Sequence, residues 1–246
     1  MRNMARAWIF LLLLAAATGV QAKEKLVFSA IEQAPHGVMG AAVLKEAYRK
    51  IGIEVDIYYT SGRRSLLISS AGTVDGEVSR VEAVGKIFTS LERIEIPLMQ
   101  LETAVFISQT HSEDWSFDDL PKLRVGYLNG ATKMEAFTKG FPDVWVGHSN
   151  RELFEMLLAG HLDAVVTSLE TGRVTARQVG AEGIVVMERL VQQENLYHYL
   201  HRKNRDLAPK ITAVLKQMTE SGELEAILNA TMDELLTVGY PEFAVR

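Results

Sequence analysis

SGRRSLLISSAGTVDGEVSR (residues 61–80) and SNRELFEMLLAGHLDAVVTS (residues 149–168) follow one pattern, although 88 positions separate them in the chain. Each begins with a serine that can cap a helix, continues with an apolar run, reaches a glycine suited to ending a helix, and finishes in β-branched apolar residues. Both stretches therefore predict a helix, a turn and a strand. Aligned without a gap, they share the pairs Ser61 and Ser149, Arg63 and Arg151, Ala71 and Ala159, Gly72 and Gly160, Asp75 and Asp163, and Val78 and Val166.

Two copies of one helix-turn-strand unit indicate a chain built from two similar α/β lobes. Chance convergence on a common unit is the alternative explanation, and both explanations predict the same local geometry. Asp75 and Asp163 recur just before the strands, which favours a role in the turns over catalysis. Ligands of open α/β sheets bind beyond the carboxyl ends of the strands. Arg80 and Ser168 stand at those ends, which predicts a ligand site there.

The N-terminal residues have the features of a secretory signal. Arg2 and Arg6 precede a short uncharged apolar run, and small residues end the segment at Ala22. The run is shorter than the roughly 20 residues that cross a bilayer. A cleaved signal over 1–22 is therefore predicted, rather than the alternative of an uncleaved membrane anchor. We expect a mature chain that begins at Lys23 and is located in the periplasm.

The composition is that of a globular protein, with 48% hydrophobic and 23% charged residues. Exported proteins are often stabilised by disulfides, but this chain has no cysteine, so its core must stabilise the fold and lipid attachment through a cysteine is excluded. With Arg2 and Arg6 removed, the 26 basic residues fall to 24 against 31 acidic ones, a net charge of −7. We expect no nucleic-acid partner because no general basic field is present.

Strand and helix patterns alternate in the first part of the chain. Strands are predicted at 26–30 and 53–59, with a helix at 37–50 between them, and the first repeated unit follows. Two such βα units and a third strand form a parallel sheet by the right-handed crossover rule. Another strand is predicted at 103–108, and the polar stretch HSEDWSFDDLP (111–121) then connects to the second part of the chain.

The second part repeats this order. Strands are predicted at 123–127 and 143–147 on either side of a helix at 132–139, and the second repeated unit comes next. Residues 184–187 are again apolar. This part of the chain therefore predicts a lobe of the same kind.

The chain is then expected to return to its first lobe. A strand is predicted at 195–200, and apolar residues at helical spacing fill 207–236. Two crossings between the lobes imply a hinge. We predict that one lobe contains 23–108 and 193–246 and that the other contains 109–192.

In this order of elements, the chain resembles the bacterial extracellular solute-binding proteins of family 3, the periplasmic amino-acid-binding type. The resemblance extends from Leu26 to Leu228 and rests on SAGTVDGEV, DLPKLRVGYLNGATKMEAF and LLAGHLDAVVTS, followed by a strand and helices. It implies two mainly parallel α/β lobes, joined by two hinge strands, that close over a small solute. It implies no catalysis and no cofactor, and it implies an inner-membrane ABC permease as partner.

Ser79 and Arg80 end the strand of the first unit and are candidate ligand contacts. A guanidinium there can hold a carboxylate through two parallel hydrogen bonds, and the family commonly uses an arginine in this way. The family's arginine lies several residues further on, near Lys86, so Arg80 is a candidate by geometry and not by motif. The alternative is a surface arginine paired with Glu77 or Glu82.

Three further candidates belong to the first lobe. Glu32 follows the first strand, Tyr59 ends the second, and Arg64 lies near the start of the next helix. Either Arg63 or Arg64 can meet an acidic group of a ligand. Because Arg63 has a counterpart in Arg151, a shared structural role is favoured for it, and Arg64 is the predicted contact.

The second lobe offers the turn of Gly130, Ala131 and Thr132 between a strand and a helix. Free backbone donors and the positive end of the helix dipole make such a turn receptive to anions. The resemblance implies that a Gly-x-Thr sequence contributes to binding a ligand carboxylate, which carries over to Gly130 and Thr132. The alternative is that Thr132 only caps the helix.

Ser168 departs from the family's pattern. Amino-acid binders of the family generally place an aspartate there to pair with the ligand's ammonium group. The countercharge is missing unless Glu170 or Glu32 replaces it, and burying an unpaired ammonium is costly. The sequence therefore predicts a ligand that is not a standard α-amino acid, or one that binds in a different pose.

Nothing in the sequence has the spacing of a catalytic or metal motif: HExxH, GxSxG and thiols are absent. We expect a monomeric, non-enzymatic periplasmic protein that delivers a small polar or anionic solute to an ABC transporter. One alternative is a ligand-sensing subunit of a membrane signalling receptor. Another is an enzyme like cyclohexadienyl dehydratase, for which Glu32 or Glu170 would have to supply the acid.

Overall fold

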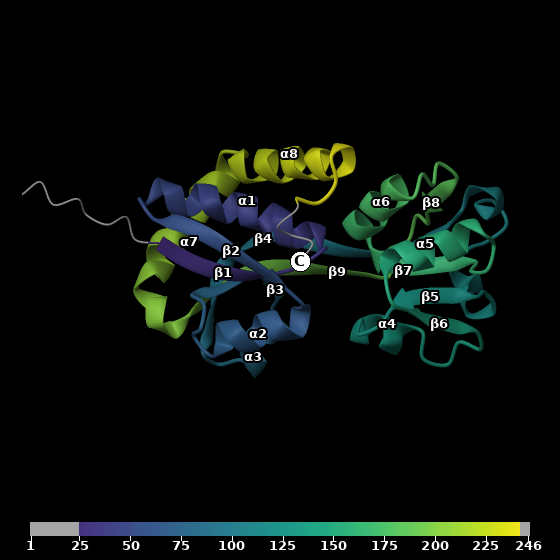
Figure 1. The fold of residues 1–246 in the computed structure, drawn as a ribbon, viewed down its shortest axis with the longest axis horizontal. Coiled ribbons are helices and arrows are strands. Elements are labelled where there is room, and N and C mark those ends of the chain that lie inside the picture. Colours follow the sequence, from purple (N-terminus) through teal and green to yellow (C-terminus); the bar gives the residue numbers. More distant parts are fainter. Residues whose placement is uncertain (1–24, 242–246) are drawn as a thin grey trace, which may run out of the picture.

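The computed structural model describes residues 25–241, which form two α/β lobes side by side (Figure 1). The predicted fold class is confirmed. The predicted signal at 1–22 lies outside the described residues. Within 25–241, none of the helices combines the length and the apolarity needed to cross a bilayer.

The first lobe is built around a parallel arrangement of β1, β2 and β3, as the crossover rule predicts. β1 pairs in parallel with β2 along its whole length and with β3 at Phe28 and Ser29. The elements of this lobe are β1 (Lys25–Ile31), α1 (Pro35–Lys50), β2 (Glu54–Thr60), α2 (Gly62–Ser70), β3 (Gly76–Val81), α3 (Ala83–Ile87), η3 (Arg202–Leu207), α7 (Ala208–Glu220) and α8 (Glu223–Thr237).

The second lobe repeats the parallel arrangement with β5 between β6 and β7. Its elements are η1 (Gln109–His111), η2 (Phe117–Lys122), β5 (Val125–Leu128), α4 (Thr132–Phe137), β6 (Val144–Gly147), α5 (Asn150–Leu158), β7 (Ala164–Ser168), α6 (Leu169–Gln178) and β8 (Ile184–Val186). The sequence pattern had predicted all of its parallel strands, but it had not predicted α6.

Two long antiparallel strands, β4 (Leu91–Ser108) and β9 (Gln192–His201), connect the lobes. They join the described strands into one sheet with the order β2-β1-β3-β9-β4-β7-β5-β6, and β8 pairs with β4. Thr103 pairs with Gln192 of β9 and also with Ser168 of β7, so the sheet passes from one lobe to the other at this residue. The predicted lobe boundaries stay a prediction.

The two repeated units adopt the same backbone. Gly72 and Gly160 end their helices with left-handed φ angles of 74° and 71°, as glycines at such positions are expected to do. Asp75 Oδ2 accepts a hydrogen bond from the backbone N–H of Val27 at 2.8 Å, and Asp163 Oδ2 accepts one from that of Arg124 at 2.9 Å. The predicted turn role of both aspartates is confirmed, because each fixes its turn to the neighbouring strand.

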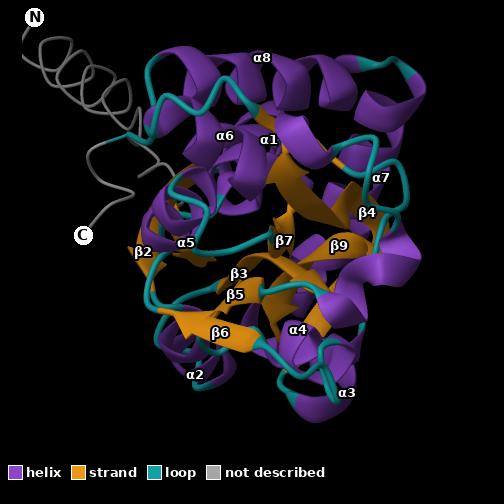
Figure 2. Ribbon diagram, turned by 90° about the vertical axis from the view of Figure 1, so that its right-hand side faces the viewer, coloured by secondary structure: helices purple, strands orange, loops and turns teal. Residues whose placement is uncertain are grey.

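Helix α6 connects the second lobe to the core of the first. Val174 on α6 is fully buried and belongs to the hydrophobic cluster that contains Leu44 and Leu215 of the first lobe. In the view down the long axis of the molecule, α6 lies with α1 and α8 on one side of the strands, whereas α2, α3 and α4 lie on the other side (Figure 2). The lobes therefore share a packed contact on one side in addition to the two crossing strands.

Candidate ligand-binding cleft

Two adjoining cavities lie between the lobes. The inner cavity has a volume of about 440 Å³ and the outer cavity about 600 Å³. Five residues, drawn from both lobes, line both cavities: Glu32, Gln33, Leu128, Asn150 and Thr171. Because the cavities share these residues, they form one cleft.

The inner cavity lies where the fold places ligands, beyond the carboxyl ends of β1, β5 and β7. Its wall is mostly apolar, with hydroxyl and amide groups between the apolar side chains. The lining residues are Ile31, Glu32, Gln33, Ala34, His36, Gly62, Leu101, Thr103, Leu128, Asn129, Gly130, Ala131, Met134, Asn150, Val166, Thr167, Ser168 and Thr171.

The loop after β1 contributes a strained residue to both cavities. Gln33 has a φ angle of 50°, the one positive φ among the non-glycine residues that the structure describes. Such backbone conformations cost about 1–3 kcal/mol and are frequent at binding and catalytic sites. The neighbouring Glu32 is half-buried, and its backbone N–H donates to the Thr60 carbonyl at 3.0 Å.

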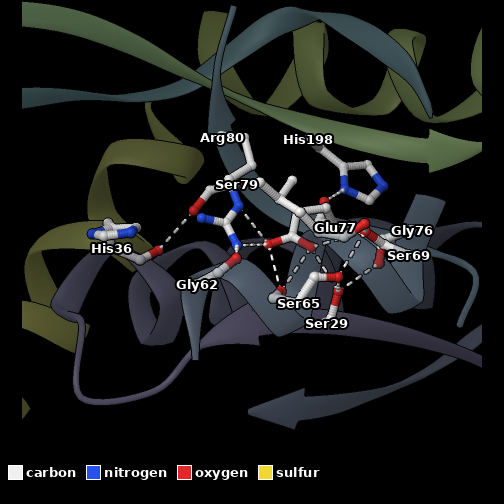
Figure 3. Close-up of polar contacts among 11 residues, drawn as sticks. Ser29, His36, Gly62, Ser65, Ser69, Gly76, Glu77, Ser79, Arg80 and His198 are labelled. Atoms are coloured by element: carbon white, nitrogen blue, oxygen red, sulfur yellow. Dashed lines mark hydrogen bonds and ion pairs between the residues drawn. The ribbon is translucent and has the colours of Figure 1, made fainter. Parts of the chain in front are cut away.

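Arg80 lies just behind Gly62, which lines the inner cavity. Glu77 holds the guanidinium in place (Figure 3). Its Nε donates to Glu77 Oε1 at 2.6 Å, and its Nη2 donates to the Gly62 carbonyl at 2.9 Å and forms an ion pair with Glu77 Oε1. Only 11% of the arginine side chain is exposed. The sequence alternatives were a ligand contact and a surface ion pair, whereas the structure shows a buried ion pair next to the cavity wall.

Glu77 is fully buried and accepts hydrogen bonds from three serine hydroxyls as well as from Arg80. Ser29 donates to Oε2 at 2.6 Å, Ser65 donates at 2.7 Å, and Ser69 donates to Oε2 at 3.2 Å (Figure 3). We name Ser29, Ser65, Ser69, Glu77 and Arg80 the Glu77 cluster. A buried charge needs such partners, because an unpaired one carries a large desolvation cost.

His36, the second residue of α1, lines the inner cavity on the side of Arg80. Its backbone carbonyl accepts a hydrogen bond from Ser79 Oγ at 3.4 Å. Its Nδ1 is buried and has no hydrogen-bond partner among the described residues. Burial, and then the nearby charge of Arg80, lower the pKa of His36 to about 4, so the ring is neutral near pH 7.

The turn of Gly130 and Ala131 lines the inner cavity, as predicted for this strand end. Gly130 has a φ angle of 83°, and Ala131 is the N-cap of α4. Thr132 is exposed, does not line either cavity and makes no capping hydrogen bond. The capping alternative for Thr132 is therefore wrong, and the Gly-x-Thr residues only partly face the cleft.

Ser168 lines the inner cavity and also caps α6. Its Oγ accepts a hydrogen bond from the Thr171 N–H at 3.3 Å and donates one to Thr171 Oγ1 at 2.7 Å. Glu170 does not line either cavity. Burial raises its pKa, and its Oε2 is buried without a hydrogen-bond partner among the described residues. Of the two carboxylates predicted to replace the missing aspartate, the structure brings only Glu32 to the cavity wall.

The remaining predicted contacts lie away from the cavity walls. Tyr59 is buried in β2, and this burial raises its pKa to about 12. Arg64 is exposed on α2, and Ser79 is buried beneath His36. Ligand binding by any of these residues stays a prediction.

Sequence reasoning had not singled out His36 and Asn150, although both line the cleft. The rule that ligands bind beyond strand ends could have found them, because His36 follows β1 and Asn150 follows β6. Their identities gave no further signal, since His36 belongs to no motif and Asn150, within the second repeated unit, aligns with Gly62 and so is not one of its shared residues. No group of three or more histidine, aspartate or glutamate side chains in residues 25–241 is placed to hold a metal ion.

Solved structures share this architecture at low sequence identity. The sensor domain of a histidine kinase with similarity to periplasmic binding proteins superposes with a TM-score of 0.66 at 15% identity, over 85% of this chain and 95% of that chain. An amino acid ABC transporter substrate-binding protein from Streptococcus pneumoniae, bound to L-arginine, gives 0.69 at 15% identity, over 92% and 98% of the two chains.

A third solved structure is described as the precursor of an enzyme. The ancestral amino-acid-binding protein AncCDT-1, a precursor of cyclohexadienyl dehydratase, superposes with a TM-score of 0.65 at 18% identity, over 85% of this chain and 95% of that chain. No family model and no curated protein matches the sequence. The similarities show that the chain has the two-lobed fold of periplasmic binding proteins, as the resemblance to family 3 predicted.

Proposed function

We propose that this chain is a periplasmic solute-binding protein that captures a small polar solute between its lobes for delivery to an ABC transporter. The observation that carries the proposal is the cleft, whose walls come from the strand ends of both lobes. A volume of about 440 Å³ in the inner cavity suits a small molecule. Binding would favour the closed arrangement because the solute contacts both lobes only there.

A ligand screen by thermal unfolding tests the proposal. Amino acids, organic acids and amines are added to the purified protein, and the melting temperature is measured. A ligand at a hundred times its dissociation constant stabilises the fold by about 2.7 kcal/mol, which for this chain length corresponds to a rise of roughly 5–10 °C. The proposal fails if every compound leaves the melting temperature unchanged.

A pair of tryptophan variants, one at the N-cap of α4 and one within the helix, locates the binding. Ala131 lines the inner cavity, so Ala131→Trp fills it and should abolish the ligand's thermal shift. Ala136, five residues on, is exposed and lines neither cavity, so Ala136→Trp should keep the shift. Equal shifts in both variants would place the ligand outside the cleft.

A sensor role for the same cleft is favoured by the similarity to a histidine kinase sensor domain. In that role, ligand-driven closure is detected by a membrane signalling protein rather than by a permease. Permease and ATPase genes beside the gene for this chain would support transport, and a lone sensor gene would support signalling. Incubation with prephenate tests the dehydratase alternative directly, since an enzyme would form product faster than a control without protein.

A further inference from the structure

The charges around the inner cavity are unbalanced. Glu32 is the single charged residue among those that line it, and neither lysine nor arginine is among them. Within residues 25–241 the Glu32 carboxylate forms no ion pair, and the hydrogen bond of this residue is made by its backbone N–H. The wall therefore presents one carboxylate and no cation.

Arg80 does not correct this imbalance, although it lies close to the wall. A Cβ atom at Gly62 would stand 3.6 Å from Arg80 Nη1, which places the guanidinium directly behind this glycine. However, Nε and Nη2 are bound to Glu77 and to the Gly62 carbonyl, and Glu77 supplies a full countercharge. The pair adds no net charge to the cavity.

The cation of the outer cavity is a weak partner for a ligand carboxylate. Arg151 lines only that cavity, its side chain is 56% exposed, and it already lies 3.7 Å from Glu155. Exposed charges are screened by water and salt, so such a pair contributes little. A carboxylate in the inner cavity would meet neutral hydroxyl, amide and imidazole groups and no cation, and its desolvation would remain largely uncompensated.

We infer that the inner cavity takes an amine without a carboxylate, whose ammonium group pairs with Glu32 and whose apolar body packs against Leu101, Met134 and Val166. This inference rests on the proposed solute-binding function and narrows its ligand class. The ammonium forms charge-assisted hydrogen bonds with the Glu32 carboxylate. A neutral polar group of the ligand, where it has one, meets the unpartnered Nδ1 of His36.

Matched pairs of compounds test this inference. Each pair consists of an amino acid and the amine left when its carboxylate is removed: phenylalanine and phenethylamine, leucine and isoamylamine, lysine and cadaverine, arginine and agmatine. Affinities are measured by isothermal titration calorimetry. We expect at least one amine to bind about tenfold or more tightly than its parent amino acid. A hydrogen bond to a charged group changes an affinity by about tenfold or more, and burying the carboxylate of the amino acid costs desolvation free energy.

Variants assign the effect to Glu32. Glu32→Gln should weaken binding of the amine by at least about tenfold. Glu188→Gln, which changes an exposed glutamate that lines neither cavity, should leave the affinity unchanged. The melting temperatures without ligand should match in both variants and the original protein, which separates loss of binding from loss of folding.

The possible outcomes separate this inference from the proposed function. If the amino acids bind as tightly as their amines or more tightly, the inference is wrong and solute binding stands. A loss of amino-acid binding in Arg151→Ala would then place the carboxylate at the outer cavity. If neither member of any pair binds and the wider ligand screen is also negative, both are wrong.

Discussion

The two repeated units have one backbone but opposite interiors. With the offset of 88 residues, three buried positions are polar in the first unit and apolar in the second, and all six side chains are at most 2% exposed. The aligned pairs are Ser65 and Leu153, Ser69 and Leu157, and Glu77 and Val165. The shared glycine and aspartate fix the turn, so the side chains beneath it are free to differ.

The neighbouring strand explains how each interior is accommodated. Gly126 of β5 leaves room for Leu153, because a Cβ at this glycine would lie 2.9 Å from Leu153 Cδ2. The equivalent position on β1 is Ser29, whose hydroxyl donates to Glu77. The first unit thus holds an arginine beside the cleft through a buried carboxylate, and the second presents only the hydroxyl of Ser168.

The largest effect is expected from removing the carboxylate of the first unit. Glu77→Ala leaves Arg80 as a buried, unpaired charge and removes the acceptor of three serine hydroxyls, so it should destabilise the fold by about 3–5 kcal/mol. Urea unfolding measures this. Glu95→Ala breaks the exposed pair with Arg93 and should cost no more than about 1 kcal/mol. Similar losses of unfolding free energy in both variants would show that the Glu77 cluster stabilises the fold no more than an exposed ion pair does.

A double substitution sharpens this result. When Arg80→Ala is combined with Glu77→Ala, no charge remains unpaired. The double variant should therefore lose less unfolding free energy than the sum of the losses in the two single variants. The expected coupling is about 0.5–3 kcal/mol. Strict additivity of the two losses would contradict a direct interaction.

A buried histidine should make the first lobe sensitive to acid. His198 is fully buried, its ring contacts the Tyr48 hydroxyl at 3.0 Å and the Glu77 carbonyl at 2.8 Å, and burial lowers its pKa to about 4. Between pH 6.5 and pH 4 the unfolded chain binds a proton that the folded chain excludes. Stability should therefore fall with falling pH by up to about 1.4 kcal/mol per unit from this group. His198→Gln should flatten the slope, and an unchanged slope would reject the assignment.

The two left-handed glycines give a smaller, matched comparison. Gly160→Ala forces alanine into the left-handed region, which costs about 1–2 kcal/mol, and no atom lies within 4 Å of the new Cβ. Gly72→Ala has the same backbone cost, and its Cβ would also lie 2.9 Å from the His201 ring. We expect Gly72→Ala to lower the midpoint of urea unfolding further. The reverse order would mean that His201 moves aside without cost.

The smallest difference is expected at the two serines that begin the units. Ser149 Oγ accepts a hydrogen bond from the Glu152 N–H at 3.1 Å, so Ser149→Ala should cost about 1 kcal/mol. Ser61 makes no capping bond, and Ser61→Ala should stay within about 0.5 kcal/mol. Calorimetric melting temperatures of both variants test this, and equal shifts would contradict it.

Much of the fold could be predicted from the sequence because its parallel strands and longer helices have clear periodicity. Among the elements that were not predicted, two were hidden for physical reasons. The first part of β4 contains Pro97, and the strand pairing shifts register on both sides of it, which interrupts the alternating pattern. Helix α6 contains Gly172, Thr171 and Thr175, which are poor helix formers, so its stability comes from packing rather than from propensity.

The site was less predictable than the fold. Glu32, Gly130 and Ser168 do line the inner cavity, because the position of strand ends follows from topology alone, and their contact with a ligand stays a prediction. The sequence offered Glu77 as a partner of Arg80 in a surface ion pair, but the burial of that pair could not be read from it, since Glu77 lies on a strand whose apolar neighbours suggested an apolar interior. Tertiary pairing decides such cases, and a single chain carries no direct record of it.

The burial of Val174 restricts how the two halves of the molecule can move apart. This side chain extends from the second lobe into the hydrophobic core of the first. Withdrawing it would expose apolar surface to water, which costs a free energy of about 25 cal/mol per Å². Separation on that flank is therefore opposed, whereas the opposite flank has no such anchor among the described residues. We therefore expect the lobes to rotate about the packed contact at α6 when a ligand enters, without separating on that side.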